Sequence, residues 1–228
     1  MKAEGRRRKE EERPTGEARR VWVCFAVKEE GGAFRRLVKG RGGPKVILTG
    51  MGKRNAERAL REALVRERPE LVLSCGFAGG LRPDLRGGTV VFAAGADTGL
   101  EPALLAAGAK PVRFHCADRV AATTAEKQAL HKTTGTDAVE MESESIWAVC
   151  RERGIPCAIV RVILDAAGED LPLDFNRLLT AEQQMSYRKL AIALAKSPGR
   201  VRALLKLQRQ AQAAAEKLAG VLHGITGS

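Results

Sequence analysis

One uninterrupted apolar stretch constrains the fold of this 228-residue chain more than any other feature. Residues 157–164, CAIVRVIL, are apolar apart from Arg161, and the run ends at Asp165. Such a run is typical of a strand buried on both faces of a sheet in an α/β protein. Ligands bind at the carboxyl ends of strands in these folds. The sequence therefore predicts a cleft at Asp165, and we expect Glu142, from the segment just upstream, to share it. A surface helix followed by a core strand that happens to end in Asp is the plainer alternative.

Strand-like and helix-like segments alternate along the rest of the chain. Strands are predicted at 21–27, 45–49, 70–75, 89–95 and 111–116, and helices at 55–68, 124–131, 139–153, 180–196 and 200–222. This alternation predicts an α/β fold, a three-layer αβα sandwich with a mixed central sheet. We expect one compact catalytic domain over residues 21–196 and an extra basic amphipathic helix over residues 197–228.

The net charge of +12 is concentrated at the two ends of the chain. Residues 1–20 hold eight Lys/Arg against five Asp/Glu, and residues 188–228 hold eight Lys/Arg against Glu216 alone. The long segment between them is nearly neutral, which argues against a broad nucleic-acid footprint, so we expect no nucleic-acid partner. Residues 1–20 are charged and almost without apolar side chains, so they are predicted to be a disordered extension.

The cysteines and histidines point away from disulfide and metal chemistry. Five cysteines, at positions 24, 75, 116, 150 and 157, lie mostly in apolar runs without a CxxC pair, which favours reduced core thiols in a cytoplasmic protein. The three histidines show no metal-ligand spacing, so we expect no metal and no cofactor. No apolar run approaches the ~20 residues that span a bilayer. The first twenty residues also lack the apolar core of a signal peptide.

Two glycine-rich segments and a pair of acids follow predicted strands. GMG at 50–52 lacks the third glycine of the dinucleotide fingerprint, because Asn55 stands in its place, and a plain tight turn explains it as well. The glycines of GFAGGL at 76–81 let the main chain approach a small molecule, or simply pack tightly. Glu29 and Glu30 follow the first strand. One of them could be a general base, although local evidence favours two solvated loop acids.

Five motifs, in this order, carry a resemblance to a known family: AVKEE, GMGKRNA, GFAGGL, VEMES and VRVILD. Together they resemble the nucleoside phosphorylase/nucleosidase superfamily, which includes methylthioadenosine/S-adenosylhomocysteine nucleosidase, futalosine hydrolase and purine nucleoside phosphorylase. The likeness covers roughly residues 21–195 and implies a phosphorylase/hydrolase-like fold. GFAGGL, VEMESES and VRVILDAAGEDLPLDFN look most like the hopanoid-biosynthesis-associated branch, which is thought to release adenine from adenosylhopane.

The resemblance implies roles for the residues at matching positions. Glu142 resembles the glutamate that binds the ribose 2′- and 3′-hydroxyls, and Met141 would pack against the ribose. Asp165 resembles the acid that protonates the purine at N7, and Glu30 resembles the glutamate that activates the attacking water in hydrolytic members. The base and nucleophile pocket is expected to include Phe77, Ala78, Gly79, Val120 and Phe175, with Arg161 and Glu140 in support.

The chemistry of N-glycosidic cleavage explains these residue types. Positive charge develops on the sugar and negative charge on the departing base, so a proton donor is needed on one side and a positioned water or phosphate on the other. An aspartic acid with a reference pKa of ~3.9 donates poorly near neutrality, so we expect apolar burial to raise the pKa of Asp165. Glu142 should stay ionised to accept two hydroxyl hydrogen bonds.

Three positions depart from the hydrolase specific for methylthioadenosine. That enzyme typically has Ser where this chain has Phe77, an aromatic residue near Val120, and Ser where Leu164 stands. These differences argue against methylthioadenosine as the substrate. They favour an adenine nucleoside with a different, bulky 5′ substituent.

The positions of arginine residues and the presence of Glu30 bear on whether the nucleophile is water or phosphate. Phosphorolytic relatives tend to place an Arg just ahead of the glycine segment, where LVLSC has none, so hydrolysis is favoured. Arg35, Arg36 or Arg54 could still serve phosphate, which would then be a co-substrate. Phosphorolysis therefore stays as the alternative.

Residues 200–222 are predicted to form an amphipathic helix with Arg202, Lys206 and Arg209 on its basic side. Such a helix could lie on the anionic inner membrane surface, which would suit a lipid-bearing nucleoside, or it could pack on the domain or across a dimer. The resemblance implies a homodimer. Two non-enzymatic alternatives stay open, an idle homologue that binds a nucleoside or a membrane partner, and nucleic-acid binding by the basic ends with steep salt dependence.

Overall fold

The structure is a computed structural model that describes residues 19–40, 42–180, 182–183, 186, 188–190, 192 and 199–227. The predicted extension 1–20 and the predicted helix 180–196 fall mostly outside the described residues. Within the described part, no helix is long and apolar enough to cross a membrane.

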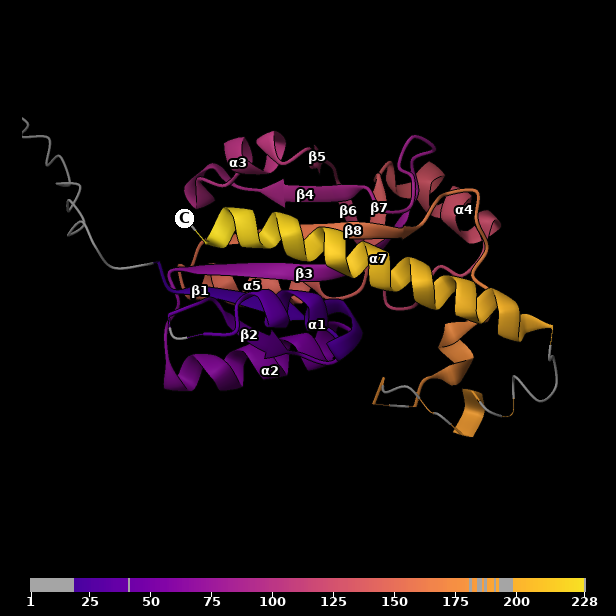
Figure 1. Cartoon of the computed structure of the whole chain (residues 1–228), viewed down its shortest axis with the longest axis horizontal. Coiled ribbons are helices and arrows are strands. Elements are labelled where there is room, and N and C mark those ends of the chain that lie inside the picture. Colours follow the sequence, from indigo (N-terminus) through magenta and orange to yellow (C-terminus); the bar gives the residue numbers. More distant parts are fainter. Residues whose placement is uncertain are drawn as a thin grey trace, which may run out of the picture.

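Eight strands form one mixed sheet, with β3 (Leu71–Gly80) and β8 (Cys157–Asp165) at its centre (Figure 1). The strand order along the main path is β2 (Lys45–Leu48), β1 (Val21–Phe25), β3, β8, β4 (Val90–Ala94) and β5 (Lys110–Pro111). Only the β4–β8 pair on this path is antiparallel. Beyond it, β7 (Ala138–Glu140) pairs antiparallel with the end of β3 and parallel with β6 (Phe114–Cys116).

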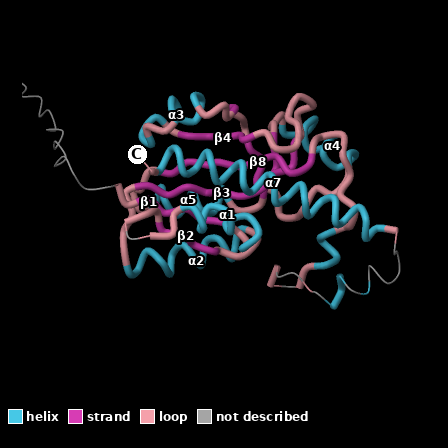
Figure 2. Tube along the Cα trace, in the orientation of Figure 1, coloured by secondary structure: helices cyan, strands magenta, loops and turns pink. Residues whose placement is uncertain are grey.

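Helices cover both faces of the sheet (Figures 1 and 2). One face packs against α1 (Lys28–Leu37), α3 (Glu101–Ala106) and α7 (Arg200–Thr226), and the other against α2 (Lys53–Arg66) and α5 (Ser143–Glu152). The remaining long helix, α4 (Thr124–Thr134), lies beside the carboxyl end of β8. The predicted three-layer αβα sandwich with a mixed sheet is confirmed.

The predicted helix 139–153 would have carried both Glu140 and Glu142. In the structure neither residue lies on a helix. Glu140 belongs to β7, Glu142 is the residue before α5, and α5 begins at Ser143. The Glu140 carboxylate accepts hydrogen bonds from the Glu142 and Ser143 N–H groups at 2.9 and 2.8 Å. These are among the first N–H groups of a helix, which have no partner within it. A strand residue thus caps α5, and this shortens the helix.

The GFAGGL segment is strand rather than loop, so Phe77, Ala78 and Gly79 lie on β3. Its neighbour β8 pairs with residues 76–79 as far as Asp165, and β7 pairs with Gly79 and Gly80, so this stretch keeps ladder partners. The register shifts between Ala78 and Gly79. The central pair of strands therefore extends to the site edge of the sheet.

Two further boundaries differ from the sequence prediction. Helix α1 begins already at Lys28, with two residues between it and β1, so Glu29 and Glu30 lie in its first turn. Glu29 is exposed but Glu30 is buried, so the interpretation of two solvated loop acids is wrong for Glu30. The predicted strand 111–116 is divided into the short strands β5 and β6.

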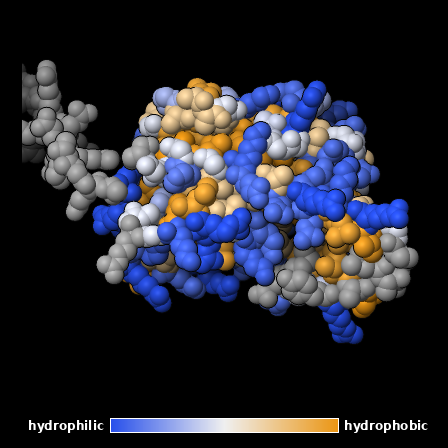
Figure 3. Space-filling model, viewed as in Figure 1, coloured by the Kyte–Doolittle hydropathy of each residue, from blue (hydrophilic) through white to orange (hydrophobic). Residues whose placement is uncertain are grey.

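Helix α7 packs on the domain with its C-terminal half. The apolar positions Ala214, Ala215, Leu218, Ala219 and Leu222 are buried in the largest core cluster, together with residues of α1 and the sheet. Near its start, Val201 and Leu205 are 40% and 50% exposed. Figure 3 shows hydrophilic side chains over much of α7 on the side facing the viewer. The apolar face predicted for 200–222 is therefore divided between core and surface.

Candidate active site

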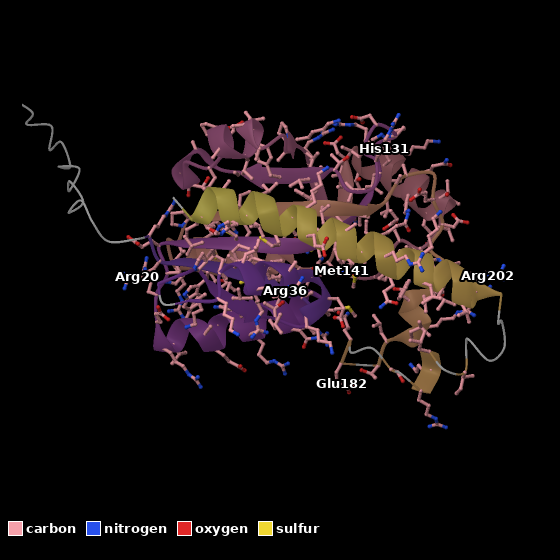
Figure 4. The ribbon with its side chains drawn as sticks, viewed as in Figure 1. Arg20, Arg36, His131, Met141, Glu182 and Arg202 are labelled. Atoms are coloured by element: carbon pink, nitrogen blue, oxygen red, sulfur yellow. The ribbon has the colours of Figure 1, made fainter. Side chains whose placement is uncertain are left out.

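A cavity of about 230 Å³ opens at the carboxyl ends of β1, β3 and β8. Figure 4 labels one of its lining residues, Met141, close to α7, and Leu207 of α7 lines the same cavity. Arg161 lies behind the cavity, buried within β8. The other predicted site residues all line it: Glu30, Phe77, Ala78, Gly79, Val120, Glu140, Met141, Glu142, Asp165 and Phe175.

Glu30 is held by backbone N–H groups from two elements. Its Oε2 accepts hydrogen bonds from Ala26 at 2.9 Å and Val27 at 3.3 Å, where β1 meets α1, and its Oε1 accepts one from Phe77 at 2.9 Å. Burial raises the pKa of Glu30, while Arg161 and these hydrogen bonds act in the opposite direction. The result is a fixed carboxylate whose proton affinity is higher than that of an exposed glutamate.

Gly76 makes this arrangement possible. Its φ of +143° lies in a region that side-chain-bearing residues rarely adopt. A Cβ atom at this position would lie 2.6 Å from Glu30 Oε1 and 2.8 Å from an Arg161 guanidinium nitrogen. The first glycine of GFAGGL therefore lets β3 pass directly against the buried charges.

Glu142 is held between a main-chain amide and a buried cation. Its Oε1 accepts a hydrogen bond from Gly52 N–H at 2.9 Å, and its Oε2 lies 3.3 Å from Arg161. Burial raises the pKa of Glu142 to about 7, because the nearby Glu140 and Glu30 carboxylates add to the effect and outweigh Arg161. The expected ionised form thus predominates only above about pH 7. The last residue of the GMG turn, Gly52, thus supplies the N–H group that binds the Glu142 carboxylate.

Arg161 is the shared cation of Glu140 and Glu142, which it contacts, and of Glu30, which acts on it electrostatically. Its Nη2 donates to Glu140 at 2.7 Å, to Glu142 at 3.3 Å and to Ser74 Oγ at 3.1 Å. Burial would lower the pKa of Arg161, but the carboxylates hold it above its usual range. For Glu140, burial is outweighed by Arg161 and the hydrogen bonds from Glu142 and Ser143, so its pKa is lowered. The lowered pKa favours the ionised form of Glu140, which is therefore the counter-ion of Arg161.

Asp165 lies across the cavity at the end of β8, with 11% of its side chain exposed. Burial raises its pKa, and the ion pair of its Oδ2 with Lys127 Nζ opposes that rise. Lys127 comes from α4 and its side chain is fully buried. A raised pKa is the direction that a proton donor requires.

Apolar side chains close the rest of the cavity. Leu171, Leu179 and Leu207 line it beside Phe175. Asn176 holds the backbone of Val120 on both sides, accepting from its N–H at 2.8 Å and donating to its carbonyl at 2.9 Å. Asn176 therefore fixes the position of the Val120 backbone in the cavity wall.

Several of these residues were missed by the sequence analysis. Lys127 stands three residues before Leu130, which packs in a small core cluster, so helical periodicity was an available signal that Lys127 faces inward. Asn176 lies in a short 3-10 turn and Leu207 on the part of α7 nearest the cavity, and no local pattern marks either. Within the described part of the chain, no group of three His, Cys, Asp or Glu side chains is arranged to hold a metal ion.

The chain is similar in sequence and in fold to known nucleosidases. The 5′-methylthioadenosine/S-adenosylhomocysteine nucleosidase of Geobacillus thermodenitrificans is 28% identical over 176 residues, covering 59% of this chain and 71% of that protein. The protein of the same description from Geobacillus kaustophilus is 30% identical over 176 residues, covering 59% and 72%. The structure of a futalosine hydrolase mutant of Helicobacter pylori has a TM-score of 0.62 at 18% identity, covering 90% of this chain and 99% of that one.

The sequence model of the Phosphorylase superfamily matches residues 23–105 and 106–197. These two ranges include every predicted site residue, and the resemblance inferred from the five motifs is confirmed at the level of this family. The protein belongs to the phosphorylase superfamily and is an enzyme of that family.

Proposed function

We propose that this enzyme hydrolyses the N-glycosidic bond of an adenine nucleoside with a bulky 5′ substituent. The observation that carries the proposal is the meeting of Glu30, Glu142 and Asp165 in one cavity, although they are far apart in the sequence. All three carboxyl groups have raised pKa values, and for Glu30 and Asp165 this direction suits proton transfer.

The proposed reaction assigns the two proton transfers to different carboxylates. Asp165, protonated, gives its proton to N7 of the purine, so the base departs neutral. Glu30, ionised, takes a proton from the water whose oxygen forms the new bond to C1′ of the ribose, while the bond from C1′ to N9 breaks and its electron pair leaves with the purine. The products are a free purine and a ribose with a C1′ hydroxyl. Glu142 accepts hydrogen bonds from the 2′- and 3′-hydroxyls, and Met141 packs against the sugar.

The carboxylates of the cavity favour water over phosphate, and Arg119, which also lines the cavity, is already paired with Glu126 at 2.6 Å. Glu30 and Glu142 would both repel a phosphate dianion in this poorly solvated site. Arg35, Arg36 and Arg54, which could have served phosphate, are exposed and do not line the cavity. Phosphorolysis of the same class of nucleoside remains the second candidate, because the family includes phosphorylases by name.

The apolar wall supports a large, apolar 5′ group. Leu171, Phe175, Leu179 and Leu207 line the cavity, and its volume of about 230 Å³ is below the ~300 Å³ at the small end of ligand pockets. A bulky substituent must therefore extend through the mouth. Adenosylhopane, implied by the resemblance, is one such substrate, and the methylthioadenosine and futalosine types named for the relatives are the smaller alternatives.

An adenine-release assay over a panel of 5′-substituted adenosines tests the proposal. The panel runs from methylthioadenosine to adenosines with long apolar 5′ groups, each with and without phosphate. We expect release without phosphate, with kcat/KM rising with the apolar bulk of the 5′ group. Release that requires phosphate would replace hydrolysis by phosphorolysis, and a preference for methylthioadenosine would overturn the proposed 5′ specificity.

Two proposals on partners remain from the sequence. The exposed start of α7, with Val201 and Leu205 beside Arg202 and Lys206, supports a peripheral contact with an anionic membrane surface, which co-sedimentation with anionic vesicles would test. Trp147, 55% exposed on α5, supports a homodimer, which sedimentation analysis of the wild type and of W147A would test.

A further inference from the structure

Lys127 is a charged side chain with no exposed surface. Lysine is almost never fully buried unless it is paired. It projects from α4 toward the turn that follows β8, where Asp165 ends the strand. A buried ammonium at this place requires an explanation in terms of its partners.

Those partners are three oxygen atoms of one short segment. Lys127 Nζ forms an ion pair with Asp165 Oδ2 and donates to the carbonyl of Ala166 at 2.9 Å and to that of Glu169 at 2.6 Å. An ammonium has three N–H donors and no acceptor, and the two carbonyls take two of these donors. The Oδ2 atom of Asp165 is buried and accepts no hydrogen bond of good geometry among the described residues, so the charge of Lys127 is what balances it.

The same segment is fastened to the start of α4 by two more contacts. The Asp170 carboxylate accepts the Thr124 N–H at 2.6 Å, and Leu171 N–H donates to the Ala122 carbonyl at 2.8 Å. Asp165, its turn and the start of α4 therefore form one unit, and Lys127 lies at its centre.

We propose that Lys127 is a positioning residue for proton delivery, binding Asp165 Oδ2 so that the carboxyl presents its other oxygen, Oδ1, to the purine. This inference rests on the proposed role of Asp165 as the general acid. Lys127 itself touches neither base nor sugar. Its effect on the reaction passes through the orientation and the proton affinity of Asp165.

Other charged groups also face Asp165. Glu169 and Asp170 come from the turn and Lys206 from α7, and these three line a second cavity that Asp165 shares. The main cavity, which Asp165 also lines, adds four further charged residues: Glu30, Arg119, Glu140 and Glu142. Lys127 is the cation in direct contact, so its removal should favour the protonated form of Asp165 to a higher pH while leaving the carboxyl free to rotate.

The test compares K127M with the matched control K45M, which removes a lysine that is paired with Glu67 at a distance from the cavity. Adenine release is measured from pH 5 to pH 10 for an adenosine and for its N7-methylated analogue, whose base carries positive charge and leaves without a proton. For K127M we expect kcat on the adenosine to fall by about 10²-fold, with little change in KM and with the basic limb shifted to higher pH. Turnover of the N7-methylated analogue should be nearly unchanged, as should both activities of K45M.

Two further variants, K127Q and D165N, separate a structural role of Lys127 from the proposed role and separate this inference from the proposed function. Gln at position 127 keeps hydrogen-bond donors for the two carbonyls but no charge, so it should give the same pH shift with a smaller loss of stability. If K127M and K127Q lose both activities together with the fold, Lys127 is structural and the inference is wrong. An unshifted basic limb in a folded variant also contradicts it. If D165N retains adenine release, the proposed function fails first, whereas a loss in D165N with none in K127M overturns the role of Lys127 alone.

Discussion

Arg161 Nη2 lies 2.7 Å from Glu140 Oε2 inside the core, directly behind the cavity. Breaking a buried pair by removing one partner leaves an uncompensated charge and costs about 3–5 kcal/mol. We therefore expect R161M to lower the free energy of unfolding by about that amount at pH 7, as measured by urea denaturation. R61M is the matched control, because Arg61 also pairs with two glutamates but on the surface, and it should change stability little. Equal losses in the two variants would show that Arg161 is not a special buried cation.

Gly76 should tolerate no side chain. In G76A the Cβ would lie 2.6 Å from Glu30 Oε1, and the backbone would keep an unfavourable φ, so we expect a loss of more than about 2 kcal/mol and a misplaced Glu30. G88A is the control, since Gly88 also has a positive φ but open space around it. In G88A the free energy of unfolding should fall only by the cost of the unfavourable backbone conformation, about 1–2 kcal/mol. Chemical denaturation of both variants measures the difference, which should vanish if close contact with Glu30 is unimportant.

Glu142 should make substrate binding pH-dependent. Because its pKa is about 7 and the ionised form accepts the ribose hydroxyls, KM should fall as pH rises through about 7. In E142Q this step should be absent and KM high throughout. Steady-state kinetics between pH 5.5 and 8.5 would check both, and a KM step that survives in E142Q would assign it to another group.

The same raised pKa has a consequence for stability. A carboxyl whose folded-state pKa is raised contributes stability that is fully present below its unfolded value of 4.5 and is lost as pH rises through about 7. The free energy of unfolding of the wild type should therefore decline relative to that of E142Q across this window. A difference between the two proteins that is independent of pH would contradict the assignment.

Glu30 should be needed for turnover but not for binding. E30Q cannot take a proton from water, so kcat should fall by about 10²–10⁴-fold while KM for the nucleoside changes little. E29Q is the control, because Glu29 is the exposed neighbour on the same turn of α1. Kinetics on the best nucleoside of the panel would measure both, and equal effects would remove Glu30 from the reaction.

The sequence predicted the three layers of the fold better than it predicted the bounds of the individual elements. The continuous run 157–164 is β8, because burial on both faces leaves no alternation to misread. The predicted strand 70–75 ended before GFAGGL, whose three glycines are unfavourable in a strand, and the neighbouring β8 explains why the ladder continues. The helix at 139–153 was extended too far, because a capping carboxylate from β7 resembles a helical acid in the sequence.

Long-range partners account for what the sequence could not predict. The burial of Lys127 depends on a turn some forty residues downstream, at Ala166 and Glu169. Likewise, the pKa of Glu142 depends on Arg161, Glu140 and Glu30, which meet only in the folded sheet. Spacing along the chain indicates which residue types are present, but their proton affinities follow from burial and from neighbours in space.

The most direct measurement is adenine release by D165N in the absence of phosphate. Asn at this position keeps the size of the side chain but cannot donate a carboxylic proton to N7. The account predicts that the wild type liberates free adenine from a 5′-substituted adenosine and that D165N, with an unchanged circular dichroism spectrum, is slower by at least about 10²-fold. Adenine release at the wild-type rate from folded D165N would contradict the central claim.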